Sequence, residues 1–183
     1  MKELSLNILD IAMNSVKAGA SVITILIEET RDLLAFSVID DGCGMTKEQV
    51  EKLSNPFFTT RTTRKVGMGI PFLLLAAKQT GGDVIIHSLP QSENPDGHGT
   101  TLKATFNKNH IDFTPLGDII STLITLIQGY PNIDFIFRHT VDDIEQVYLS
   151  TVEIKQTLGS DIPINSFEIL DWIKQFLEEQ YKK

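Results

Sequence analysis

Four groups of polar and glycine residues stand where one expected element gives way to the next. Asp10 and Asn14 are four residues apart in a stretch with helical spacing, so their side chains share one face. "DDGCGM" (residues 40–45) follows the apolar run "LLAFSVI", "GMG" (67–69) precedes an apolar helical stretch, and "GHGT" (97–100) opens a later strand. Free N–H groups at a helix start can receive phosphate, so the chemistry in question is that of a nucleotide site. Taken alone, however, "DDGCGM" is more often a turn that ends a strand, because Gly accepts positive φ and Asp bonds its own backbone.

The elements that would position these groups follow from periodicity and turn residues. Apolar residues at helical spacing predict a first helix that ends near Gly19, and β-branched runs then predict a hairpin of two strands. Thr46 and Gln49 form a capping-box pattern that opens a short helix. A further helix and two strands follow, so the order indicates a sheet with helices on one face. The expected ranges are helices at 3–18, 46–55 and 70–82, and strands at 21–29, 33–40, 83–89 and 99–106.

After residue 110 the pattern starts again. Thr114 and Pro115 are expected to open a helix that runs to about Gln128, and two strands are expected at 133–141 and 145–150. A last helix is expected from Ser166. Residues 111–183 therefore form a small α+β region, which either extends the sheet or packs as a separate lobe. Trp172 in this region either packs in the core or anchors a partner.

Composition restricts the class of protein. Sixteen Lys and Arg against 24 Asp and Glu give the 183 residues a net charge of -8, which argues against binding to nucleic acid or to anionic membranes. One cysteine, Cys43, excludes an internal disulfide and a multi-cysteine metal site, and fits a reducing cytoplasm. The start lacks the uninterrupted apolar region of a signal peptide, and the apolar stretches are too short to span a bilayer. We expect a soluble, cytoplasmic protein.

In their order along the chain, these motifs resemble the ATP-binding GHKL superfamily of DNA gyrase B, heat-shock chaperones, sensor histidine kinases and MutL-type mismatch-repair ATPases. The matching segments are "DIAMNSVKAGA", "DDGCG", "NPFFTTR", "GMGIPFLLLAAKQTGG" and "GHGT". Each is weak alone, but five in order are specific. The resemblance covers residues 3 to about 106 and assigns residues 1–110 to a histidine-kinase-like ATP-binding domain. It implies a Bergerat-type α/β (α+β) two-layer sandwich, with a mixed, mostly antiparallel sheet and helices on one face.

The resemblance also implies roles for the residues around the base and the metal. Asp40 would accept a hydrogen bond from the adenine amino group, assisted through water by Thr100. Gly42 and Gly44 would let the backbone approach the base without a Cβ. Asn14 would supply the side-chain oxygen that holds Mg²⁺ against the phosphates.

The segment between these motifs resembles the family's lid. The loop through Gly67 and Gly69 would close over the triphosphate with its amides facing the charge. Arg61, Arg64 and Lys65 would supplement those amides, although each cation also fits an exposed loop. The nucleotide-binding residues implied for this segment are Phe58, Thr59, Thr60, Arg61, Lys65, Gly67 and Gly69.

Asp10 departs from the family pattern. Gyrase-like and mismatch-repair members carry glutamate at this position, as the base that orients the attacking water. Aspartate is one methylene shorter, so Asp10 is either the general base or a carboxylate that supports Asn14 and the metal.

The resemblance leaves three hypotheses for the function. The first is a stand-alone Mg-ATP-binding protein, a switch or slow ATPase that signals to a protein partner through its C-terminal region. The second is a kinase that phosphorylates a separate partner, as anti-sigma-factor kinases do. The third is a non-catalytic nucleotide-binding module of a larger signalling complex. None of the four histidines has the acidic helical context of a phosphoacceptor, and the sequence leaves open whether ATP closes a homodimer.

Overall fold

Six strands form one sheet in the part of the chain that the computed structural model describes, residues 3–54, 69–159 and 161–182. Their order is β3-β4-β2-β1-β5-β6. The strand β5 runs parallel to β1, and the other neighbouring pairs are antiparallel. The predicted mixed, mostly antiparallel sheet is therefore confirmed. The strands are β1 (Val22–Glu29), β2 (Leu33–Asp40), β3 (Val84–Leu89), β4 (Gly99–Asn107), β5 (Asp134–Val141) and β6 (Ile144–Ser150).

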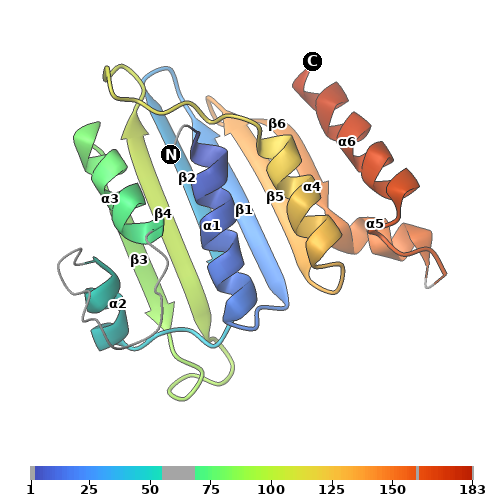
Figure 1. The fold of residues 1–183 in the computed structure, drawn as a ribbon, viewed down its shortest axis with the longest axis horizontal. Coiled ribbons are helices and arrows are strands. Elements are labelled where there is room, and N and C mark those ends of the chain that lie inside the picture. The colour runs from blue at the N-terminus through green and yellow to red at the C-terminus, as the bar shows by residue number, and fades with distance from the viewer. Residues whose placement is uncertain (1–2, 55–68, 160, 183) are drawn as a thin grey trace.

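The helices cover one face of this sheet (Figure 1). The helices α3, α1, α4 and α6 lie side by side in that order, because α1 contacts both α3 and α4, and α4 contacts α6. The result is the predicted two-layer α/β sandwich. The helices are α1 (Leu4–Lys17), α2 (Lys47–Ser54), α3 (Gly69–Gln79), α4 (Ile119–Gly129), α5 (Thr151–Leu158) and α6 (Phe167–Tyr181). No helix among the described residues has the length and apolar content that a membrane crossing needs.

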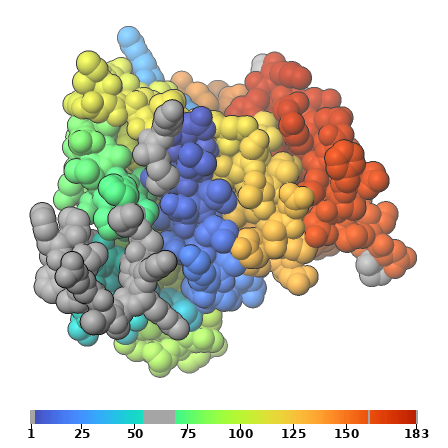
Figure 2. Space-filling model, viewed as in Figure 1, coloured from blue at the N-terminus to red at the C-terminus, as the bar shows by residue number. Residues whose placement is uncertain are grey.

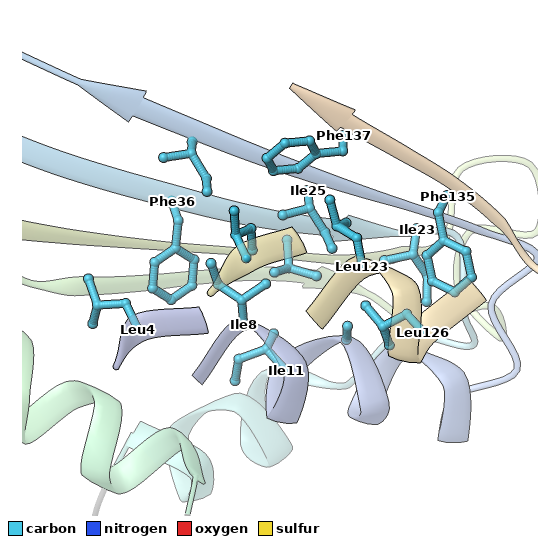
Figure 3. Close-up of a cluster of buried hydrophobic side chains, with 14 of the residues drawn as sticks. Leu4, Ile8, Ile11, Ile23, Ile25, Phe36, Leu123, Leu126, Phe135 and Phe137 are labelled. Carbon is cyan, nitrogen blue, oxygen red and sulfur yellow. The ribbon is translucent and has the colours of Figure 1, made fainter. Parts of the chain in front are cut away.

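Alternation along the strands builds the core between the two layers. In β1, Ile23, Ile25 and Ile27 are buried toward the helices while their neighbours are partly exposed, as a strand with one covered face requires. Figure 3 shows the labelled side chains of α1 and α4 meeting those of the sheet. The cluster includes Leu4, Ile8 and Ile11 of α1, Leu123 and Leu126 of α4, and Phe36, Phe135 and Phe137 of the sheet.

Residues 111–183 contribute to this same sheet and core. Their strand β5 pairs with β1 over its full length, from Val22 opposite Asp134 to Glu29 opposite Val141. Phe135 and Phe137 are 1% and 0% exposed within the cluster that α1 also enters. Of the two alternatives that the sequence left open, the structure shows the extension of the sheet.

The start of α4 differs from the prediction. We expected Thr114 and Pro115 to open the helix, but it begins at Ile119, and Asp118 accepts a hydrogen bond from Ser121 N at 2.9 Å as the N-cap. The segment before α4 instead accepts hydrogen bonds from the first residues of α1. The backbone N–H groups of Leu4 and Ser5 donate to the carbonyls of Pro115 and Leu116 at 2.9 and 2.8 Å. Those donors have no partner within α1, and the carbonyls of the non-helical segment at 115–116 satisfy them.

A polar cluster ties the C-terminal helix to the first strand. His139 Nδ1 lies 2.8 Å from Tyr181 Oη, and His139 Nε2 lies 3.2 Å from Glu29 Oε1. Lys108 Nζ pairs with Glu29 Oε2 at 2.8 Å. The close approach of His139 and the ion pair with Lys108 outweigh burial and lower the pKa of Glu29 from its ordinary 4.5 to about 2.

Replacing Glu29 is expected to cost stability in a pH-dependent way. A lowered folded-state pKa stabilises the protein above the unfolded value of 4.5, and the contribution disappears as pH falls from 4.5 toward 2. Glu29→Gln should therefore lower the free energy of unfolding by about 2–3 kcal/mol at pH 7, and by much less near pH 2.5. Urea unfolding of both proteins at pH 7, 4.5 and 2.5 measures this difference.

The neighbouring Glu28 supplies the matched control. Its ion pair with Lys103 is 2.7 Å long, but about half of each side chain is exposed, so Glu28→Gln should change stability by less than about 1 kcal/mol. A gap between wild type and Glu29→Gln that stays constant down to pH 2.5 would contradict the assigned pKa.

Candidate functional site

Asp40, the last residue of β2, has a carboxylate that is fixed on both oxygens. Ser15 Oγ donates to Oδ2 at 2.5 Å, and Gly42 N donates to Oδ1 at 2.9 Å. Ser15 lies on α1, 25 residues before Asp40, and is 3% exposed. The side chain of Asp40 itself remains partly exposed. Each carboxylate oxygen has a second lone pair, so Asp40 is an oriented acceptor with capacity for a further donor on each oxygen.

A pair of hydroxyl groups lies beside this carboxylate. Thr100 is opposite Asp40 in the β2–β4 register, and its Oγ1 is 2.8 Å from Ser88 Oγ. Ser88 Oγ also accepts a hydrogen bond from Met45 N at 2.8 Å and donates to the carbonyl of Gly99 at 3.0 Å. These hydrogen bonds hold the turn after β2 against the ends of β3 and β4.

The two glycines of this turn have protein neighbours. Gly44 has a φ of +65°, and a Cβ there would lie 1.9 Å from the carbonyl oxygen of Leu89. A Cβ on Gly42 would lie 2.8 Å from the Cβ of Ala18. Close packing of the chain on itself therefore requires both glycines, independently of any ligand. Their expected role in making room for a base stays a prediction.

A cavity of about 690 Å³ opens next to Asp40 and Thr100. The helix α2 contributes Lys47 and Glu51 to its lining, and β3, β4 and the segment before β4 supply most of the remainder. The predicted capping box holds the start of α2: Thr46 N donates to Gln49 Oε1 at 2.8 Å, and Gln49 N donates to Thr46 Oγ1 at 3.4 Å. The volume is in the range of small-molecule sites, so the cavity has room for a nucleoside.

Asp10 and Asn14 form a second group on the exposed face of α1. The helix α3 begins at Gly69 directly against Asp10, because a Cβ on Gly69 would lie 3.1 Å from Asp10 Oδ2. A carboxylate at the positive end of a helix is favourably placed. Asn14 lies one turn further along α1, and neither residue lines the cavity beside Asp40.

The donors of this second group suit Mg²⁺. The carboxylate of Asp10 and the amide oxygen of Asn14 are hard oxygen ligands on one helix face, and both side chains are exposed. Mg²⁺ is usually held by one or two protein oxygens together with water and phosphate, so these two residues fit such an ion. Among the described residues, no group of three or more His, Cys, Asp or Glu side chains gathers as a metal site.

The helix α1 links the two groups, because it carries Asn14 toward solvent and Ser15 toward Asp40. Asp40 and Thr100 come together at the cavity, and Asp10 and Gly69 come together at the start of α3. The remaining predicted residues lie outside the described part of the chain: Phe58, Thr59, Thr60, Arg61, Lys65 and Gly67.

Three residues of the site were missed by sequence reasoning. Ser15 is a polar residue in the buried stripe of α1, and that position was the available signal. Ser88 alternates with exposed neighbours in β3, so its direction also followed from the strand pattern. His98 lies in the loop before β4, and its Nδ1 is 2.6 Å from the carbonyl of Gly42. No sequence signal indicated that contact.

A six-stranded mixed sheet with one helical layer makes the described chain a two-layer α/β sandwich, and an oriented aspartate at the end of β2 lines its cavity. Residues 1–110 match the family described as histidine kinase-, DNA gyrase B-, and HSP90-like ATPase, so the chain belongs to this family. The predicted superfamily and fold are confirmed.

Relatives support both the family and the fold. The chain is 26% identical to Sporulation kinase E of Bacillus subtilis over 105 residues, 57% of this chain and 13% of that protein. It is 31% identical to the Non-motile and phage-resistance protein of Caulobacter vibrioides over 121 residues, 61% of this chain and 14% of that protein. The chain therefore spans only about a seventh of the length of these relatives.

Among solved structures, the MutL ATPase domain of Aquifex aeolicus complexed with ADP has a similar fold. The TM-score is 0.54 at 12% identity, and the match covers 86% of this chain and 68% of that one. This is a longer share of the chain than residues 1–110, so part of the C-terminal region has a counterpart in that fold.

Proposed function

We propose that this chain binds Mg-ATP and acts as a stand-alone cytoplasmic switch or slow ATPase that signals to a protein partner through residues 111–183. The observation that carries the proposal is the Asp40 carboxylate, which Ser15 and Gly42 hold in the wall of a nucleoside-sized cavity. Membership of an ATPase family supports it.

Asp40 gives the proposal its selectivity for adenine. An ionised carboxylate only accepts hydrogen bonds, and the adenine edge presents an amino donor where guanine presents a carbonyl. A guanine base would cover the Asp40 carboxylate without offering it a donor, which costs affinity. Thr100, which is opposite Asp40 in the β2–β4 pair, would share a bridging water with the base.

In this proposal, Asp10 and Asn14 on the exposed face of α1 lie on the side of the site where the phosphates bind. Asn14, supported by Asp10, would hold Mg²⁺, and the metal would neutralise phosphate charge and bridge its oxygens. The free amides at the start of α3, which begins at Gly69 beside Asp10, would donate to the phosphates. In this proposal the predicted residues of 58–67, with the cations Arg61 and Lys65, complete the phosphate contacts.

A kinase function is the second candidate, and one observation favours it. Relatives of this chain include Sporulation kinases E and C of Bacillus subtilis and the signal transduction histidine-protein kinase AtoS of Escherichia coli. In this version the chain would pass the ATP phosphoryl group to a separate protein. A non-catalytic module that only binds nucleotide is the third candidate.

One experiment with γ-labelled ATP and Mg²⁺ distinguishes the three. Steady release of labelled phosphate supports the ATPase, and label that appears only on an added protein supports the kinase. Binding with neither outcome supports the module. Calorimetry with a non-hydrolysable ATP analogue precedes these assays, and absence of binding would overturn all three. Sedimentation with the same analogue shows whether nucleotide closes a homodimer.

A further inference from the structure

An apolar groove lies at the edge of the sheet farthest from β3. Strand β6 and the helices α5 and α6, which lie at this edge in Figure 1, supply its lining residues. Its volume is about 470 Å³. Its floor and walls include Ile154 and Leu158 of α5 and Ile169 of α6. Trp172 and Phe176 complete the α6 wall, with their rings stacked at 5.3 Å. They remain 50% and 37% exposed, so the groove presents a contiguous apolar surface of the kind that marks interaction sites.

The surroundings of this groove are acidic. Glu153, which accepts a hydrogen bond from Tyr148 Oη at 2.7 Å, is the one charged side chain among the described residues that line it. Glu168 and Glu179 lie four residues before and seven residues after Trp172, so they share its face of α6, and both are exposed. Lys155 on α5 does not offset them, because it pairs with Asp134 at 2.6 Å.

At Tyr148 the outer edge of β6 is closed to an added strand. The side-chain amide of Gln180 accepts from Tyr148 N at 3.0 Å and donates to Tyr148 O at 3.1 Å. These are the two backbone groups that an incoming strand would use at this position. A partner that binds beside Tyr148 therefore binds through side chains in the groove, as an amphipathic helix does.

We propose that the groove binds one amphipathic helix of a partner protein, with an apolar stripe that covers Trp172 and Phe176 and with Lys or Arg along its flanks. Aromatic side chains in a pocket are typical binding hot spots, and the acidic rim selects a basic flank. This inference states which kind of protein segment the partner in the proposed function would use. The signalling role of the groove rests on that proposed function. Binding at the groove itself is measurable without nucleotide.

Trp172 is the only tryptophan of the chain, so its fluorescence reports on the groove alone. The probe is a tryptophan-free helical peptide of about 18 residues, with Leu at helical spacing and Lys at the other positions. We expect a saturable blue shift of Trp172 emission as the peptide removes it from water. A peptide with Glu in place of every Lys should bind at least about tenfold more weakly. A scrambled Leu and Lys peptide without an apolar stripe should bind at least as poorly.

Two phenylalanine variants localise the binding. Phe176→Ser should weaken the Leu and Lys peptide at least about tenfold. Phe72→Ser, which changes a 52% exposed side chain of α3 outside the groove, should leave its affinity unchanged. Equal effects of the two variants, or equal binding of the three peptides, would overturn the proposal.

Two further outcomes are distinguishable. A blue shift that grows with protein concentration without peptide, with a dimer in sedimentation that Phe176→Ser dissolves, would assign the groove to a second copy and overturn the proposal. ATP calorimetry on the same sample tests the proposed nucleotide function independently of the groove. Nucleotide binding without peptide binding overturns the proposal for the groove and leaves the proposed function standing. Peptide binding without nucleotide binding overturns the proposed function and supports the groove as a binding site.

Discussion

Asp40→Asn is expected to raise the dissociation constant for ATP at least about 100-fold, the largest effect on binding of any single substitution in this site. The wild-type carboxylate receives Ser15 Oγ and Gly42 N and has a lone pair on each oxygen for a further donor. An asparagine has one oxygen for these donors, and Gly42 N takes it. Its amide nitrogen then stands where the base needs an acceptor, so a donor faces a donor.

Titration calorimetry with a non-hydrolysable ATP analogue measures this loss, and Asp41→Asn is the matched control. Asp41 accepts from Ser21 N and Val22 N at 2.7 and 2.9 Å, and it does not line the cavity. We expect Asp41→Asn to leave the affinity within about threefold of the wild type while costing about 1 kcal/mol of stability. Affinity retained in Asp40→Asn would contradict the assignment of the base site.

The features that the sequence predicted well are those with a local cause. The hairpin of β1 and β2 was visible because alternation and β-branched residues determine a strand within a few positions. The capping box of Thr46 and Gln49 was visible because both partners lie within one helical turn. The order of the motifs indicated the family for the same reason, since each motif is a short run of residues.

The features that the sequence did not predict depend on contacts between segments that are far apart along the chain. The hydrogen bond from Ser15 to Asp40 needs both the packing of α1 on β2 and the position of the strand end. The glycine at position 44 is required by Leu89, which only the β3 edge brings there. The parallel pairing of β5 with β1 could not be chosen from periodicity, because the same pattern suits either edge of a sheet or a separate lobe.

Asp10→Asn is expected to lower the rate of Mg-ATP hydrolysis at least about 100-fold, if the chain hydrolyses ATP with Asp10 as base. Asp10 lies on the exposed face of α1, against the first residue of α3, where the free helix amides meet the proposed phosphates. An amide at this position cannot take a proton from water. The affinity for the analogue should stay within a few-fold of the wild type, because a general base contributes to the transition state and not to ground-state binding.

Asp10→Glu and magnesium titrations separate the two roles of this residue. If the shorter side chain limits the reach of the base, Asp10→Glu should raise the turnover number and leave the affinity for Mg-ATP unchanged. If Asp10 instead supports Asn14 and the metal, Asp10→Asn should weaken Mg²⁺-dependent binding as much as it lowers turnover, and nucleotide binding without Mg²⁺ should not change. Equal losses in turnover and in Mg²⁺-dependent affinity would therefore contradict the base role, because a residue that acts only on the attacking water has no contact with the metal to lose.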